Sequence, residues 1–302
     1  MRTWEKRSAK EDAGKTLEKF LRESGFSRKE ISRLKFRQQG MTVDGHPCRS
    51  TEILKEGQRI SLRLDDDTAA EYAVRKDLPE ISICYEDRDL LILDKPSGIS
   101  CHPGRGHFDD SLGSQAASYL RAKGEGNTLR LIGRLDKDTS GAVVFAKNQA
   151  ASARLWKQRE DGSFHKTYTA LVHGILEPAE GRISVPLEAV PGVKNRMRTA
   201  EEGKGAVTCY RTRKVCHASG RQVSFVECTL ETGRTHQIRV HMASLGHPVL
   251  GDPFYGQPDG MPRLCLHAEK VELRQPFTGE DIQIQIFSPF CQLDLDYFSR
   301  RP

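Results

Sequence analysis

Long apolar runs are missing from this chain of 302 residues. No stretch approaches the about 18 apolar residues that a membrane-spanning helix requires, and charged residues make up 29% of the sequence. The N-terminal segment, MRTWEKRSAKEDAGK, lacks the apolar core of a secretory signal. We therefore expect a soluble cytoplasmic protein with no membrane partner, long enough for one large domain or two modest ones.

Paired cysteines are missing as well. The eight cysteines are scattered, and no two of them have the Cys-x-x-Cys spacing of zinc and redox motifs. In a reducing compartment such cysteines are free thiols, not a disulfide framework. Several possible metal ligands do gather in one stretch, which raises the alternative of a metal-dependent hydrolase: His236, His241, His247 and Asp252. The first two would point about 140° apart on a helix, so we expect no metal site.

Positive charge is concentrated in the first fifth of the chain. Residues 1–64 hold 16 Lys and Arg against 9 Asp and Glu, a net charge of +7. The whole chain has 47 basic and 41 acidic residues, so the remainder holds 31 against 32, a net charge of −1. This asymmetry predicts a module near the N-terminus that binds a polyanion.

Two short helices are predicted within this basic segment. Apolar residues spaced i, i+3 and i+4 over 16–24 indicate the first helix. The capping-box sequence Ser27–Glu30 opens the second helix, which we expect to end at Gly40. With the short strands that follow, the pattern resembles the S4 RNA-binding domain over roughly 12–64. One side of the second helix carries a basic stripe, which the resemblance implies contacts RNA: Lys29, Arg33 and Arg37.

The charge changes sign directly after this segment. Three aspartates, 65 to 67, open a stretch without apolar periodicity, so we interpret residues 65–79 as a linker. This predicts an S4-like RNA-binding domain over 1–64 and a larger domain over 80–302.

The most informative stretch of the larger domain is Gly133–Lys147, GRLDKDTSGAVVFAK. Short polar residues closed by Gly141 predict a tight loop, and the apolar run from Ala142 to Ala146 predicts a buried strand. Asp136 is therefore expected on a loop held against a core strand, where rigid scaffolds place reactive side chains. By itself, the Arg-x-Asp pair also fits an ordinary exposed turn.

The whole string resembles the R-L-D-x-x-T-S-G signature of the RluA family of RNA pseudouridine synthases. Further family segments follow in order: Lys-Pro-x-Gly with His-Pro at 95–103, Lys-x-Tyr-x-Ala-x-Val-x-Gly at 166–174, and Thr-Gly-Arg-Thr-His-Gln-Ile-Arg at 232–239. One departure is Gly133, where the family often has histidine. The resemblance implies an α+β protein, in which the small S4-like module precedes a catalytic domain with a mostly antiparallel mixed sheet.

The resemblance also implies roles for individual residues. Asp136 is the catalytic carboxylate, which either attacks covalently or abstracts a sugar proton, and both roles stay open. Arg239 pairs with this carboxylate through a charge that persists at any working pH. Tyr168 stacks on the uracil and is the candidate base for the proton on C5. Leu266 packs against the uracil ring, and Arg134 fills the helix space left by the extruded nucleotide.

Uridine and pseudouridine are isomers, so the conversion needs no redox step and no group donor. We therefore expect no metal and no nucleotide cofactor, and a monomer that acts on structured ribosomal or transfer RNA. One alternative is an S4-type RNA-binding protein that acts in ribosome assembly or RNA folding without catalysis. It is disfavoured because Asp136, Tyr168 and Arg239 occur together. A second is a DNA-binding protein built on the two N-terminal helices, which would prefer a duplex DNA site over structured RNA.

Overall fold

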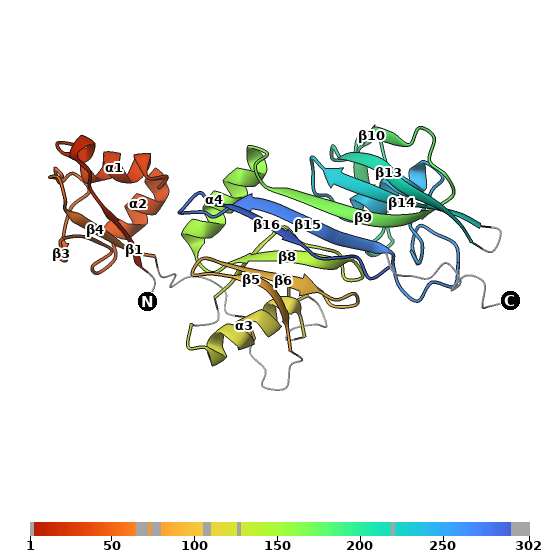
Figure 1. Ribbon diagram of the computed structural model, residues 1–302, viewed down its shortest axis with the longest axis horizontal. Coiled ribbons are helices and arrows are strands. Elements are labelled where there is room, and N and C mark those ends of the chain that lie inside the picture. Colours follow the sequence, from red (N-terminus) through yellow and green to blue (C-terminus); the bar gives the residue numbers. More distant parts are fainter. Residues whose placement is uncertain are drawn as a thin grey trace. The chain divides into compact units, whose positions relative to one another are not determined.

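The computed structural model of the protein describes residues 3–64, 72–73, 80–104, 110–125, 128–218 and 221–290, and Figure 1 shows its helices and strands. The chain divides into two compact units, Met1–Ala70 with Asn148–Ala153 and Glu71–Lys147 with Arg154–Pro302. The predicted linker lies outside the described residues except for Tyr72 and Ala73. Among the described helices, none is long and apolar enough to cross a membrane.

The first unit combines two helices with a four-stranded antiparallel sheet. The helices are α1 (Leu17–Glu23) and α2 (Arg28–Lys35), preceded by a 3-10 turn (Lys10–Asp12). The sheet has the order β1 (Thr3–Arg7), β4 (Arg59–Arg63), β2 (Met41–Val43) and β3 (His46–Pro47). Trp4 of β1 packs edge-on against Phe26 at 4.9 Å between ring centroids, so this strand helps to close the small core over the helices.

The predicted capping box of α2 is present. The Ser27 hydroxyl accepts from the Glu30 amide at 3.2 Å, and the Glu30 carboxylate accepts from the Ser27 amide at 2.7 Å. The predicted end of this helix at Gly40 is wrong, because α2 ends at Lys35. Past that point, the amide of Arg37 bonds to the carbonyl of Leu34, which tightens the last turn and ends the helix. Arg37 therefore lies beyond the helix and does not extend a single helical stripe.

The second unit is built on one large mixed sheet, as the predicted fold class requires. Its main order is β10 (Glu180–Ser184), β13 (Val207–Ala218), β14 (Arg221–Leu230), β9 (His165–His173), β15 (Leu266–Arg274), β8 (Ser140–Ala146), β6 (Leu90–Lys95) and β5 (Ser82–Glu86). Two further strands pair off this path, β16 (Asp281–Gln285) with β15 and β7 (Arg130–Ile132) with β8. Among the described pairings, only that of β8 with β15 is parallel.

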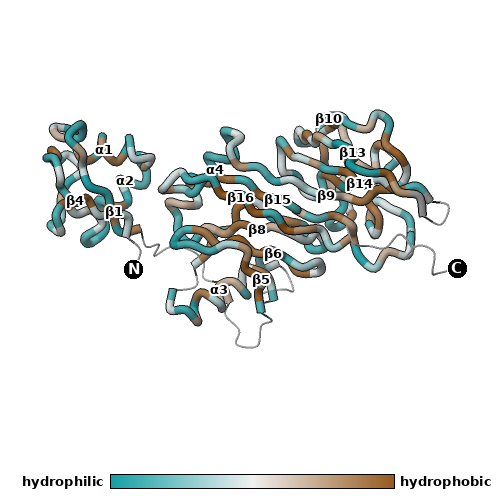
Figure 2. Tube along the Cα trace, viewed as in Figure 1, coloured by the Kyte–Doolittle hydropathy of each residue, from teal (hydrophilic) through white to brown (hydrophobic). Residues whose placement is uncertain are grey.

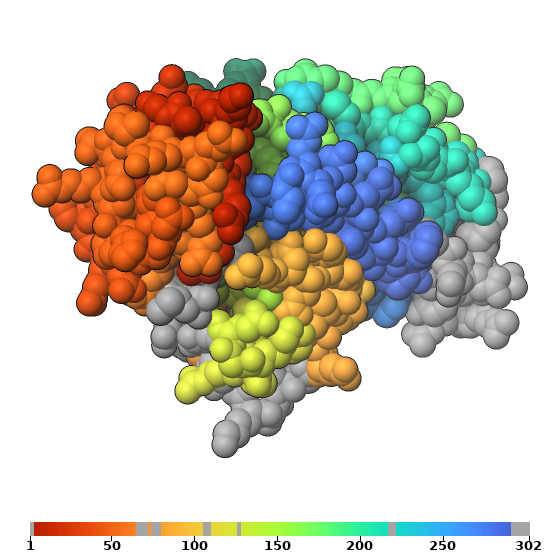
Figure 3. All heavy atoms as spheres, turned by 60° about the vertical axis from the view of Figure 1, so that its left-hand side comes forward, coloured from red at the N-terminus to blue at the C-terminus, as the bar shows by residue number. Residues whose placement is uncertain are grey.

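Helices and a small sheet accompany the large sheet. They are α3 (Leu112–Ala122), α4 (Gln149–Glu160), α5 (Gln237–Ser244) and the pair β11 (Leu187–Ala189) with β12 (Met197–Thr199). In Figure 1, α3 lies below β5 and β6 and α4 lies above β8. In Figure 3, the surface of β15 and β16 (blue) adjoins that of β5 and β6 (light orange).

The centre of the large sheet is the hydrophobic core. All seven residues of β8 are buried, as its apolar sequence predicts, and Leu90 to Leu93 of β6 have no exposed surface. Figure 2 shows hydrophobic segments along these central strands. A strand buried on both faces is rigid, and β8 begins one loop after Asp136, so the core holds that loop in place.

The two halves of the sheet meet at a narrow junction. β8 and β15 are paired only through Ser140 and Gly141 with His267 and Ala268. Gly141 has φ +104°, and a Cβ atom there would lie 2.3 Å from the Ala268 carbonyl oxygen. Glycine is therefore required at this position. The junction brings the loop that precedes β8 beside the start of β15.

Candidate active site

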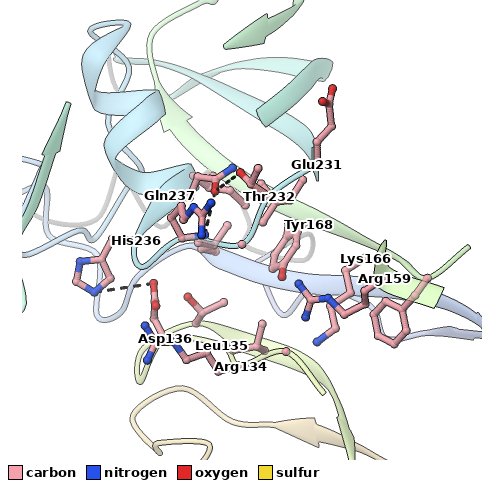
Figure 4. A pocket seen from close by; sticks show the side chains of 18 of the residues that line it. Arg134, Leu135, Asp136, Arg159, Lys166, Tyr168, Glu231, Thr232, His236 and Gln237 are labelled. Atoms are coloured by element: carbon pink, nitrogen blue, oxygen red, sulfur yellow. Dashed lines mark hydrogen bonds and ion pairs between the residues drawn. The ribbon is translucent and has the colours of Figure 1, made fainter. Parts of the chain in front are cut away.

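A pocket of about 580 Å³ opens at this junction. Its walls come from the loop between β7 and β8, the end of α4, the start of β9, the loop before α5 and the first residue of β15. The volume is in the range of small-molecule sites in proteins. Segments from positions 131 to 266 of the sequence are brought together here, and Figure 4 shows their side chains around the pocket.

Lys95 holds the loop that carries Asp136 through hydrogen bonds to backbone carbonyls. This lysine is fully buried, and its ammonium donates to the carbonyls of Pro96, Ile99 and Lys137 at 2.9, 2.7 and 2.7 Å. Burial lowers the pKa of Lys95 to about 8. The buried cation therefore ties the Lys-Pro-x-Gly segment to the residue that follows Asp136.

Asp136 faces Arg239 of α5. The Asp136 Oδ2 atom lies 3.7 Å from Nη1 of Arg239, and the Asp136 side chain is 20% exposed. Arg239 gives its two-point fork to Asp252, with Nε to Oδ2 and Nη2 to Oδ1 both at 2.7 Å. Burial acts to lower the pKa of Arg239, but the hydrogen bonds and charge of Asp252 outweigh it and raise that pKa. A permanent cation therefore faces the Asp136 carboxylate.

His236 is a second neighbour of Asp136. Its Nε2 lies 4.0 Å from the Asp136 Oδ2 atom, as the dashed line in Figure 4 marks, and its Nδ1 bonds to the Tyr255 hydroxyl at 2.9 Å. The backbone of His236 is left-handed, with φ 55°, a strained conformation for a residue other than glycine. Burial lowers the pKa of its imidazole although Asp136 opposes this, so the ring is neutral at pH 7.

Tyr168 and Leu266 form the apolar part of the pocket. Tyr168 on β9 is 8% exposed and Leu266 at the start of β15 is 3% exposed, and both line the pocket. Burial raises the pKa of the Tyr168 phenol although the charge of Arg159 opposes this. The phenol is therefore protonated at neutral pH. Both side chains give the pocket an apolar wall.

Arg134 is exposed at the mouth of the pocket. One of its Nη atoms donates to the hydroxyl of Thr235, which precedes α5. His236 is the N-cap residue of that helix and makes no side-chain cap bond. The contact of Arg134 with Thr235 joins the Asp136 loop to the loop before α5 across the mouth.

Residues 89–244 match the family model described as RNA pseudouridylate synthase. This match covers more than half of the chain. The chain therefore belongs to the RluA family of RNA pseudouridine synthases. It isomerises uridine to pseudouridine in RNA.

Relatives and solved structures agree with this family. The chain is 37% identical over 264 residues to the uncharacterized RNA pseudouridine synthase YhcT of Bacillus subtilis (strain 168), which covers 86% of each chain. It is 35% identical over 258 residues to the ribosomal large subunit pseudouridine synthase D of Xanthomonas campestris, with 80% of this chain and 75% of the relative covered. The structure of human RNA pseudouridylate synthase domain containing 1 is 28% identical and superposes with a TM-score of 0.58 over 70% of this chain and 84% of that one.

In this RluA-family synthase, the structure brings five of the sequence-predicted site residues to the pocket or its wall: Arg134, Asp136, Tyr168, Arg239 and Leu266. The three basic residues of the N-terminal segment belong to the first unit. Lys29 and Arg33 are exposed on α2, whereas Arg37 is partly buried and donates to the Arg63 carbonyl at 3.5 Å. These three side chains therefore do not form one continuous stripe.

The wall of the pocket also contains a residue that the sequence interpretation did not select. Gln237 is 3% exposed and accepts from the Thr232 hydroxyl at 2.8 Å and the Arg234 amide at 3.0 Å. Its own amide donates to the Val207 carbonyl at 2.9 Å. These hydrogen bonds hold the loop before α5 in place. The sequence could have indicated Gln237 only through its position in the Thr-Gly-Arg-Thr-His-Gln-Ile-Arg segment. His236 lies beside it in the same segment.

The residues of the metal alternative have other partners. His241 bonds to the Thr208 hydroxyl and the Val185 carbonyl, both at 2.9 Å, and His247 bonds to the His173 carbonyl at 2.8 Å. Asp252 holds Arg239. Within the described part of the chain, no group of three His, Cys, Asp or Glu side chains is placed to hold a metal ion.

Proposed function

We propose that Asp136 is the catalytic carboxylate of this synthase. The observation that carries the proposal is its position on a rigid pocket loop, 3.7 Å from an arginine whose charge is fixed by Asp252. A guanidinium at this distance favours the ionised carboxylate, which is the form needed either to attack C1′ or to abstract a sugar proton. The reaction then breaks the N1–C1′ bond, joins C5 to C1′, and moves the proton from C5 to N1.

The uracil ring is held between Tyr168 and Leu266. Both side chains are largely buried and line the pocket near Asp136, so a detached uracil keeps an apolar contact on each side while it turns. Tyr168 is also the candidate acceptor of the C5 proton. Because burial raises the pKa of its phenol, it can accept that proton only if it first gives up its own to a neighbouring group, in line with its protonated resting state.

The target nucleotide leaves its helix or loop to reach this pocket. Asp136 lies inside the pocket, and a base within a duplex cannot reach a recessed carboxylate without extrusion. Exposed Arg134 at the mouth is placed to occupy the space that the extruded base leaves. Extrusion costs a few kcal/mol and least where the base is already unpaired, so we infer a uridine in a loop or weak helix.

The substrate is a structured RNA, ribosomal or transfer. The relative from Xanthomonas campestris is named as a pseudouridine synthase of the ribosomal large subunit. This name favours ribosomal RNA as the substrate. The first unit acts as an S4-like RNA-binding domain over 1–64, joined by a linker over 65–79 to the catalytic domain over 80–302. Its net charge of +7 supports this. We also propose that the enzyme works as a cytoplasmic monomer.

Replacement of Asp136 by asparagine tests the proposal. Asparagine keeps the size and removes the negative charge, so folding and RNA binding should persist while pseudouridine formation stops. Release of tritium from RNA labelled at uracil C5 measures the reaction, and thermal unfolding checks the fold. A rate within tenfold of the wild-type rate would show that Asp136 is not the catalytic carboxylate. Mapping of pseudouridines in RNA from cells with and without the gene identifies the substrate.

A further inference from the structure

Arg159 enters the pocket from the end of α4, a helix that carries no family motif. Its guanidinium lies over the rings of Trp156 and Phe164, with 5.1 and 5.8 Å to the ring centroids. Two aromatic faces fix the plane of the guanidinium, because a cation over a ring is attracted by its electron-rich face. Figure 4 shows Arg159 beside Lys166, on the side of the pocket away from His236.

Two glycines make room for this arginine. A Cβ atom on Gly133 would lie 2.1 Å from Nη1 of Arg159, and one on Gly233 would lie 3.2 Å from Nη2. Gly133 belongs to the Asp136 loop and Gly233 to the loop before α5, so the guanidinium sits over the backbones of both. A side chain at position 133 would occupy the space that the Arg159 guanidinium fills. The pocket is therefore shaped around Arg159 at the position where this sequence has glycine and the family often has histidine.

Arg159 also differs from the neighbouring arginines in its hydrogen bonding. Arg134 donates to Thr235, Arg234 donates through Nε to the Gly205 carbonyl at 3.0 Å, and Arg239 is bound by Asp252. Within the described ranges of the chain, Arg159 has ring contacts but neither a hydrogen bond nor a carboxylate partner. A guanidinium with its donors free and its plane fixed is suited to two-point binding of an oxyanion.

We propose that Arg159 binds a phosphate of the RNA chain next to the extruded uridine. The inference rests on the proposed function, because it places that uridine in the pocket beside Asp136. A backbone that delivers its base to the pocket must pass the rim, where each phosphate carries a negative charge. Trp156 is 45% exposed and holds the guanidinium in place from α4. Arg159 is thereby a positioning residue that fixes the backbone while the base turns.

Charge removal at two neighbouring positions of α4 tests this assignment. The substrate is a stem-loop oligonucleotide that contains the uridine found by mapping and that the wild-type enzyme converts. Arg159→Gln should raise the Kd for this RNA by about tenfold, as expected for loss of a charged hydrogen bond. It should also reduce the slope of log K against log salt by about 0.7. Lys157→Gln is the matched control, because Lys157 is exposed on the same helix and does not line the pocket.

Neutral phosphates locate the contact. Single methylphosphonate linkages around the target uridine each remove one negative charge from the RNA. One such linkage should weaken binding to the wild-type enzyme by about tenfold and should not weaken binding to Arg159→Gln any further. Additive losses at every linkage, or an equal change of slope in Lys157→Gln, would overturn the proposal. Failure of the wild-type enzyme to form pseudouridine in any RNA would instead overturn the proposed function.

Discussion

The Asp252 carboxylate accepts both hydrogen bonds of the Arg239 fork, and Asp136 faces the nitrogen that is left. The Nε and Nη2 bonds to Asp252 are each 2.7 Å long, and Nη1 lies 3.7 Å from Asp136. The Arg239 guanidinium also lies over the rings of Phe254 and Tyr255, at 5.3 and 5.2 Å from their centroids. The cation is fixed before substrate binds, so it stabilises the ionised Asp136 carboxylate without reorganisation.

Loss of Arg239 should destabilise the fold as well as the reaction. Arg239→Leu leaves the Asp252 carboxylate, which has no exposed side-chain surface, buried without its partner. Breaking a buried pair in this way typically costs about 3–5 kcal/mol, which urea unfolding will measure. Arg239→Lys keeps the charge but loses the fork, so it should recover part of this free energy. If the leucine variant is as stable as the wild type, Asp252 does not depend on Arg239.

Tyr168→Phe separates stacking from proton transfer. Phenylalanine keeps the ring against the uracil and removes the hydroxyl, so RNA binding should remain within about twofold. If the hydroxyl relocates the C5 proton, the single-turnover rate should fall by about 10² to 10⁴, the usual contribution of a general base. Because burial raises the pKa of Tyr168, raising the pH from 7 to 9 should not accelerate the wild-type enzyme through this group. A phenylalanine variant with the wild-type rate would leave Tyr168 a stacking role alone.

Lys95 should make stability depend on pH above neutrality. Its folded pKa of about 8 lies below the ordinary lysine value of 10.5. Between these two values the unfolded chain binds more protons than the folded chain, so the contribution of Lys95 to the free energy of unfolding rises with pH. It is fully present above the unfolded pKa and decreases as the pH falls through about 8.

The variant Lys95→Met lacks this titration and also leaves three carbonyls without their donor. It should be less stable than the wild type at pH 7, and the difference should grow as the pH rises from 8 to 10. Urea unfolding under reducing conditions at several pH values measures both effects. A difference that stays constant with pH would mean that Lys95 keeps its ordinary pKa in the folded protein.

Parts of the fold with a strong local pattern could be predicted from the sequence. The buried strand β8 follows from its continuous apolar run, and α2 begins at the predicted capping box. The long hairpin of β13 and β14 is less regular. A bulge between Thr212 and Lys214 interrupts the alternation there. Strand β1 was missed, because Glu5, Lys6 and Arg7 are charged and only pairing with β4 makes the segment a strand.

The pocket could be predicted only where a motif marked its residues. Asp136, Tyr168 and Arg239 each lie in a recognisable segment. Arg159 and Asp252 are defined by contacts with residues far away in the sequence or across the pocket, and no local pattern indicates such contacts. Arg239 is an example, because the carboxylates of both Asp136 and Asp252 lie near its guanidinium. Only the three-dimensional structure shows that Asp252 accepts the two hydrogen bonds.

The basic residues of the first unit should contribute affinity and not chemistry. We expect Lys29, Arg33 and Arg37 to contact RNA phosphates, and we expect their joint replacement by alanine to raise KM more than it lowers the rate with bound substrate. Each phosphate contact that is lost should reduce the slope of log K against log salt by roughly 0.7–0.9. Three contacts would therefore account for about 2 units of slope.

The structure makes the three residues unequal in this test. Lys29 and Arg33 are exposed on α2, where alanine preserves the helix, whereas Arg37 lies past the helix end with a bond to the Arg63 carbonyl. The double variant Lys29→Ala/Arg33→Ala should therefore give most of the change in slope without loss of structure, which circular dichroism will check. The additional Arg37→Ala change should also lower the thermal stability of this unit. An unchanged slope with an intact fold would show that this face is only solvated, and would move the RNA contact to Lys194, Arg196 and Arg198, which lie at and just before β12.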